Sequence, residues 1–191
     1  NNRTFIDYLS FRMNFPGLYA SQIDFLGTIK SDSKDILSLI IPELHFPLLK
    51  LFNKPDQNKL KEFIDSLEIA LGQRDFYKVF PAILGDRDPI FNDFNSIEKS
   101  CIGNDEDIRC LMFYCDPYQS SQKPYVENIN KQLRKYFPKG SSIDGFSEDE
   151  VKTINIILLE RKVASLGGFS PKEAFIKVYG KDIYEKLVEA L

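Results

Sequence analysis

The sequence has 191 residues, 43% of them hydrophobic and 16 of them phenylalanine, so it is long enough to bury the core of one domain, with or without an appendage. It holds no run of about 20 apolar residues that could span a membrane, and its N-terminus lacks the layout of a secretory signal, so we expect a soluble protein. The net charge of −3, taken alone, argues against a nucleic-acid binder, because affinity for phosphate usually appears as an excess of basic residues.

Three apolar runs with the length of β-strands dominate the first third of the chain. Before them, residues 4–15 have the pattern of a short amphipathic helix, which Pro16-Gly17 ends. Short turns join the three runs, so we predict an antiparallel three-stranded meander. The predicted strands are residues 18–27, 36–41 and 46–52.

The apolar spacing then becomes helical. Pro55 stands near the start of the next predicted helix and Gly72 just past its end. A later helical pattern opens with Ser147 and Glu150, which is the spacing of a capping box. In chain order we predict a helix at residues 55–71, a strand at 80–85, a short helix at 90–99, a strand at 110–115, and helices at 124–136, 147–159, 170–179 and 182–191.

Three antiparallel strands followed by helix, strand, helix, strand and helix is the element order of the ribonuclease H-like fold. We therefore predict an α/β protein with a mixed five-stranded sheet flanked by helices. Its expected parts are an N-terminal linker or helix (residues 1–17), a ribonuclease H-like core (18–140) and a helical C-terminal extension (141–191).

The cysteine and histidine content favours neither a disulfide framework nor a zinc site. Cys101, Cys110 and Cys115 are an odd number in no recognised spacing, and the single histidine, His45, gives them few partners. A reducing cytoplasm fits this usage, and His45 is expected to have a structural role.

Three carboxylates stand at places that the predicted elements define. Asp24 lies inside the first strand, where a carboxylate is costly unless it is paired or bound to a metal; Asp86 ends the fourth strand, and Glu127 lies one turn into a helix. Converging carboxylates are what Mg²⁺ ions need to support phosphoryl transfer. From the residues alone, Asp24 could equally be a salt-bridged residue, Asp86 a turn residue and Glu127 a solvated helix residue.

Basic residues gather around Glu127. Residues 119–140 carry five lysines and arginines against that single carboxylate. Lys131, Arg134 and Lys135 follow Glu127 at i+4, i+7 and i+8, which forms a ridge along one helix face. Such a ridge could guide a phosphate backbone, although charge runs are usually solvated faces. The predicted DNA-binding residues are Lys123, Lys131, Arg134 and Lys135.

Uncharged side chains near the same glutamate have two possible roles. Tyr118 and Tyr125 could stack on bases at a frayed DNA end, although packing in the core is the commoner role of such aromatic residues. Gln119, Gln122 and Asn128 could orient substrate or cap loops.

Four segments together resemble a known family. Residues 85–91, Gly-Asp-Arg-Asp-Pro-Ile-Phe, resemble the Asp-Asn-Gly-x-Glu-Phe box of integrase-like cores, and residues 113–130 resemble the family's segment around its glutamate. Residues 136–140, Tyr-Phe-Pro-Lys-Gly, follow as a third segment. Residues 161–175 resemble the motif that closes the family's pattern, Arg-Lys-x-Leu-Gly-x-x-Thr-Pro-x-Glu-x-Phe. In this order the segments are similar to bacterial insertion-sequence transposases with a retroviral-integrase-like core, the group called insertion sequence thirty.

The resemblance implies a DNA transposase whose Asp-Asp-Glu catalytic triad is Asp24, Asp86 and Glu127. These residues would hold two Mg²⁺ (or Mn²⁺) ions while an activated water cleaves DNA and the liberated 3′-hydroxyl is then joined to another strand. The resemblance also implies transposon ends and target DNA as partners, a homo-oligomer, and a bacterial cytoplasmic protein associated with the nucleoid.

The sequence departs from the family pattern beside Asp86. Asp88 replaces the family glycine and Ile90 its glutamate, and an acidic insertion at residues 104–107 lengthens the interval to Glu127. The alternative hypothesis is therefore a catalytically silent integrase-fold module for DNA binding or assembly; a structure-selective nuclease is a third. The family's N-terminal helix-turn-helix region has no counterpart here and the first residue is not Met, so we expect a fragment whose upstream domains are missing.

Overall fold

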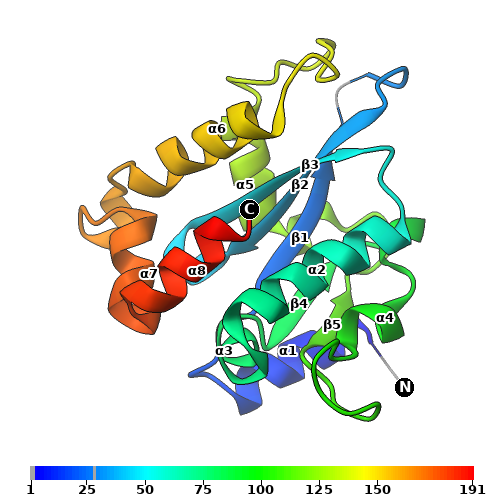
Figure 1. Ribbon diagram of the computed structural model, residues 1–191, viewed down its shortest axis with the longest axis vertical. Helices are drawn as coiled ribbons and strands as arrows, with labels where there is room; N and C mark the ends of the chain where they lie inside the picture. Colours follow the sequence, from blue (N-terminus) through cyan, green and yellow to red (C-terminus); the bar gives the residue numbers. More distant parts are fainter. Residues whose placement is uncertain (1–2, 28) are drawn as a thin grey trace.

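A five-stranded mixed β-sheet forms the centre of the protein (Figure 1). The computed structural model describes residues 3–27 and 29–191. The sheet order is β3-β2-β1-β4-β5, in which the first three strands of the chain are antiparallel neighbours and β4 and β5 run parallel to β1. The strands are β1 (Ser21–Leu26), β2 (Lys34–Ile41), β3 (Phe46–Asn53), β4 (Ala82–Gly85) and β5 (Leu111–Tyr114).

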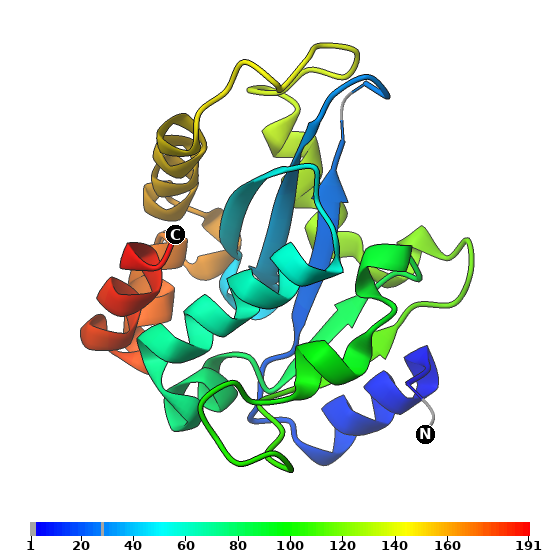
Figure 2. The same cartoon turned by 45° about the vertical axis from the view of Figure 1, so that its right-hand side comes forward.

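Helices cover both faces of the sheet, and Figure 2 shows α2 in front of the strands with α5 behind them. One hydrophobic cluster joins the sheet to α2, α3, α7 and α8, a second joins it to α5 and α6, and a third joins β4 and β5 to α1. The helices are α1 (Phe5–Asn14), α2 (Gln57–Leu71), α3 (Gln73–Val79), α4 (Phe94–Glu98), α5 (Pro124–Leu133), α6 (Glu148–Glu160), α7 (Pro171–Tyr179) and α8 (Lys181–Glu189).

Side-chain alternation along β1 decides which helix layer meets which residue. Ile23 belongs to the cluster under α2, whereas Leu26 belongs to the cluster under α5. Because successive residues of a strand point to opposite faces, Gln22 and Asp24 face α5 together with Leu26. An aspartate is thereby placed on a buried face of a central strand.

The predicted meander and the mixed five-stranded sheet are confirmed, and three local differences have identifiable causes. The helix expected from residue 55 begins at Gln57, because the Asp56 side chain accepts a hydrogen bond from the Lys59 N–H and caps it. The helix expected at 90–99 is instead a 3₁₀ turn, Pro89–Phe91, and a separate α4 capped by Asp93. Helix α3 was not predicted, although it buries Phe76 and Val79.

The three C-terminal helices pack directly against the edge strand β3. The Asn155 side chain of α6 accepts a hydrogen bond from the Leu49 N–H and donates one to the Pro47 carbonyl, which satisfies backbone groups at the sheet edge. The ring of Phe175 in α7 stacks on Phe46 with centroids 4.3 Å apart. The boundary at residue 140 stays a prediction. Among the described residues, no helix is long and apolar enough to cross a membrane.

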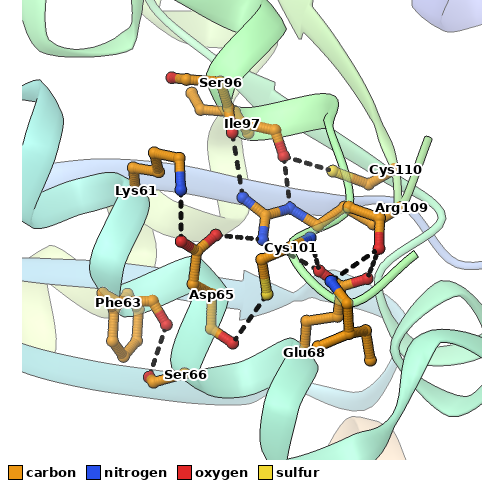
Figure 3. A network of polar contacts seen from close by, with 12 residues as sticks. Lys61, Phe63, Asp65, Ser66, Glu68, Ser96, Ile97, Cys101, Arg109 and Cys110 are labelled. Atoms are coloured by element: carbon orange, nitrogen blue, oxygen red, sulfur yellow. Dashed lines mark hydrogen bonds and ion pairs between the residues drawn. The ribbon is translucent and has the colours of Figure 1, made fainter. Parts of the chain in front are cut away.

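A buried arginine anchors the loop between α4 and β5 to α2 (Figure 3). The Arg109 side chain is fully buried and forms ion pairs with Asp65 and Glu68 at 2.5 and 3.2 Å. Its remaining N–H groups donate to the carbonyls of Ile97 and Ser96. The acidic insertion at residues 104–107 therefore lies in a loop that is held at its base by a guanidinium whose three nitrogens all donate hydrogen bonds.

We predict that Arg109→Met lowers the free energy of unfolding by about 3–5 kcal/mol, because it leaves the fully buried Glu68 without its cation and removes one of the two cations that contact Asp65. Chemical denaturation at neutral pH measures the change. Lys99→Met is the matched control: Lys99 pairs with Asp105, whose side chain is 98% exposed, so its loss should cost no more than about 1 kcal/mol.

Acidification should diminish the difference in the free energy of unfolding between wild type and Arg109→Met. Burial alone would raise the pKa values of Asp65 and Glu68, but hydrogen bonds from Lys61, Ser100 and Arg109 outweigh it and hold both pKa values below their usual range. The stability that these carboxylates contribute is present above their ordinary pKa values and is lost as the pH falls through the lowered ones, below about pH 4. A difference that stays constant down to pH 2 would contradict this assignment.

Candidate functional site

Asp24 and Asp86 lie side by side at neighbouring parallel strands. The β1–β4 register pairs Gln22 with Leu84, so the residues two positions further along each strand, Asp24 and Asp86, reach the same level of the sheet. The Asp24 side chain is 23% exposed and the Asp86 side chain 45% exposed. The sheet topology thus brings together two carboxylates that are distant in sequence.

The ammonium group of Lys123 lies between these two carboxylates. Its Nζ is 3.4 Å from Asp24 Oδ1 and 3.3 Å from Asp86 Oδ2, and it donates a hydrogen bond to the Ile23 carbonyl at 3.3 Å. The Lys123 side chain is only 6% exposed. We had predicted that Lys123 binds DNA, but the structure places its charge inside the protein, against the two aspartates.

Asn130 holds the other oxygen of Asp24. Its Nδ2 donates to Asp24 Oδ2 at 3.1 Å, and its Oδ1 accepts a hydrogen bond from the hydroxyl of Ser38 at 3.3 Å. Ser38 is the residue opposite Asp24 in the β1–β2 register. The Asp24 carboxylate is therefore oriented from both α5 and β2. We did not single out Asn130 from the sequence, although it lies three residues after Glu127 and seven after Lys123, on one helix face.

The electrostatics of Asp24 reflect its partly buried position. Burial raises the pKa of Asp24 above its ordinary value, and the neighbouring charge of Asp86 adds to this, while Lys123 opposes both. Cys115 lies directly after β5, and burial raises the pKa of its thiol to about 11. A thiol with this pKa stays protonated near neutral pH, so Cys115 adds no negative charge beside the two aspartates.

Asp86 occupies a tight turn directly after β4. Its Oδ1 accepts a hydrogen bond from the Asp88 N–H at 3.1 Å, and Asp88 in turn accepts one from the Ile90 N–H. Asp86 is therefore a turn residue, which was one of the two roles that the sequence allowed. Its other oxygen, Oδ2, faces the Lys123 ammonium. Asp88, which departs from the family pattern, caps the following 3₁₀ turn.

Gly85 allows this turn to approach the sheet closely. A Cβ atom at Gly85 would lie 2.7 Å from the terminal methyl of Met112 and 3.1 Å from Ile23 Cγ2. We therefore predict that Gly85→Ala lowers the free energy of unfolding by about 1–3 kcal/mol through overpacking. Thermal and chemical denaturation test this, with Gly17→Ala as the control, because a Cβ at Gly17 meets nothing within 4 Å. Equal stabilities of the two variants would contradict the prediction.

Glu127 does not join the two aspartates as the structure stands. It is half-buried on α5, one helical turn from both Lys123 and Asn130. Among residues 3–27 and 29–191, no group of three or more histidine, cysteine or acidic side chains is close enough to hold a metal ion. The fit to a metal is therefore partial: two of the three expected carboxylates enclose a cation, which here is the lysine ammonium.

The predicted basic ridge divides into two kinds of residue. Lys131 and Lys135 are exposed, whereas the half-buried Arg134 donates a hydrogen bond to the Gly27 carbonyl at 2.9 Å. Arg134 thereby ties α5 to the end of β1. Only the two lysines are presented freely for contacts with phosphate.

The loop before α5 is closed by Gln122 and exposes an aromatic ring. The Gln122 side chain accepts a hydrogen bond from the Asp116 N–H and donates one to its carboxylate, both at 2.8 Å. Tyr118 is fully exposed and has a φ of 60°, which is uncommon for a residue other than glycine. Tyr125 is 41% exposed and contacts the His45 ring edge-on. Gln122 thus caps the loop, and Tyr118 is available to stack on a base.

Comparison with known proteins relates part of this chain to DNA-mobilising enzymes, although no family model matches. The putative integrase ORF3 of Spiroplasma virus SpV1-R8A2 B is 29% identical over 66 residues. The transposase for insertion sequence element IS1086 of Cupriavidus metallidurans is 33% identical over 67 residues, and that for IS4351 of Bacteroides fragilis is 30% identical over 70. Part of this chain is similar to transposases. The matches cover 35 to 37% of this chain and only 20 to 22% of each relative's length.

Proposed function

We propose that this chain is the ribonuclease H-like catalytic core of a DNA transposase or integrase of the insertion sequence thirty group. The observation that carries the proposal is that Asp24 and Asp86, on neighbouring parallel strands, both contact one positive charge, the Lys123 ammonium. The sheet order and the partial similarity to transposases support it. DNA would be the substrate, a homo-oligomer the acting form and the bacterial cytoplasm the location, as the resemblance implies.

In this proposal Asp24 and Asp86 would hold Mg²⁺ or Mn²⁺, and Glu127 would complete the ligand set from α5. Two such ions would neutralise charge on the attacking and leaving oxygens of phosphoryl transfer. Asn130 keeps the Asp24 carboxylate turned toward the site, and the turn at Asp88 orients Asp86. The chain itself supplies the positioned ligands and the basic surface beside them.

We predict that Asp24→Asn, Asp86→Asn and Glu127→Gln each reduce DNA strand transfer by at least about a thousandfold, because each removes part of several kcal/mol of charge stabilisation. The assay uses the full-length protein with DNA carrying the element's ends. Glu106→Gln, an exposed residue of the acidic insertion, is the matched control and should keep wild-type activity. Retained strand transfer in Asp86→Asn or Glu127→Gln would refute the proposal.

The exposed lysines of α5 should contribute to DNA affinity through phosphate contacts. We predict that Lys131→Ala with Lys135→Ala weakens binding to duplex DNA and reduces the slope of log affinity against log salt by about 1.8, or about 0.9 per lost contact. Fluorescence anisotropy over a salt series measures the slope. The charge-matched control is Lys78→Ala with Lys181→Ala, two exposed residues of α3 and α8 on the other side of the sheet; an equal loss there would contradict the assignment.

A catalytically silent DNA-binding or assembly module is the second candidate function. The position of Lys123 favours it, since its ammonium already neutralises the two aspartates. Metal titration separates the candidates: a silent module should show no Mn²⁺-dependent rise in melting temperature that Asp24→Ala abolishes.

A further inference from the structure

We propose that Lys123 is a built-in competitor of the divalent ion: its ammonium occupies the cation position between Asp24 and Asp86 in the metal-free protein, and metal binding expels it. This inference rests on the proposed metal-dependent function. It assigns to Lys123 the role of lowering the affinity of the site for metal. Lys123 is a positioning residue here, because it acts on the two carboxylates and not on DNA.

The four carboxylate oxygens of the two aspartates are all contacted by groups of the protein. Asn130 and the Asp88 N–H contact Asp24 Oδ2 and Asp86 Oδ1, and these are uncharged donors. Lys123 contacts the remaining Asp24 Oδ1 and Asp86 Oδ2, and is the charged partner of both. An ion held by both aspartates would therefore compete with the ammonium, their shared charged partner.

Metal and ammonium compete for the negative charge of those oxygens. Mg²⁺ binds carboxylate oxygens at about 2.0–2.1 Å, closer than the 3.3 to 3.4 Å at which the ammonium lies from the same atoms. Two cations beside the same pair of carboxylates repel each other, and the Lys123 side chain is itself only 6% exposed. Binding of the ion therefore weakens the hold of the two carboxylates on the ammonium.

The contacts of Lys123 are compatible with its release. Its distances to the two carboxylates are longer than the roughly 2.7–2.9 Å of strong charge-assisted hydrogen bonds. The backbone around it is held independently, by the Gln122–Asp116 pair before it and by the Val126 N–H, which donates to Gln22 Oε1, after it. The lysine stem is flexible, and Asp86 is the more exposed of the two carboxylates that it contacts.

Mn²⁺ binding to the full chain tests the proposal, with calorimetry and thermal unfolding as readouts. Lys123→Met should bind Mn²⁺ at least about tenfold more tightly than wild type. The variant should also melt at a lower temperature without metal and show the larger Mn²⁺-dependent rise. Lys139→Met removes an exposed lysine shortly after α5 and should behave as wild type, whereas Asp24→Asn should bind poorly.

A second measurement uses the wild-type protein and does not depend on the variant folding. Lys123 should resist acetylation in the metal-free protein, because it is buried against two carboxylates, and should become several-fold more reactive when Mn²⁺ is bound. Peptide mass spectrometry follows this lysine, with exposed Lys139 as the internal reference. If Lys123→Met does not fold, Lys123→Gln replaces it in calorimetry.

The outcomes separate this inference from the proposed function. If Lys123→Met and wild type bind Mn²⁺ equally, Asp24→Asn abolishes binding and acetylation of Lys123 is unchanged by metal, the competition is overturned while the metal site stands. If neither wild type nor Lys123→Met binds Mn²⁺, the metal site itself fails and the inference falls with it. Tighter binding by Lys123→Met together with metal-dependent acetylation supports both.

Discussion

Two carboxylates at the same level of adjacent parallel strands require a positive charge between them, and much of the structure follows from that requirement. Burial raises the pKa of Asp24 and the neighbouring Asp86 raises it further, so an uncompensated pair would be unfavourable in ionised form. Helix α5 supplies the charge through Lys123 and the orientation of Asp24 through Asn130. The packing of α5 on the sheet is therefore stabilised by electrostatic contacts as well as by apolar ones.

Among the residues that the structure describes, Arg109 and Lys123 are buried cations that each face two acids, and their differences define their roles. The Arg109 guanidinium is fully buried and uses its planar fork on two carboxylates and two carbonyls. The Lys123 ammonium is a compact charge with longer contacts, beside a carboxylate that is 45% exposed. The contacts of Arg109 suit a permanent anchor for the loop before β5. Those of Lys123 suit a charge that another cation can replace.

The residues that depart from the family pattern fit into the turn beside Asp86 without displacing the carboxylate. Asp88 caps the 3₁₀ turn, and its own N–H orients Asp86. The acidic insertion lies beyond α4, in the loop that Arg109 secures to α2. Both features are accommodated locally, and Asp24 and Asp86 each lie within 3.4 Å of the Lys123 ammonium. The position of Glu127, outside the pair, is where the structure and the expected triad differ.

Local patterns in the sequence determined the order of strands and most helices along the chain, the meander, and the placement of Asp24 within a strand and Asp86 at a strand end. These features depend on alternation, spacing and caps between residues that are near in sequence. Only the tertiary structure decided that Lys123 turns inward and that Asn130 orients Asp24, because these contacts join residues 100 and 106 positions apart. Helix α3 and the burial of Arg109 were likewise not foreseen. A lysine beside a basic ridge has the same local pattern whether it meets phosphate or a carboxylate, and the packing of α5 on β1 makes the choice.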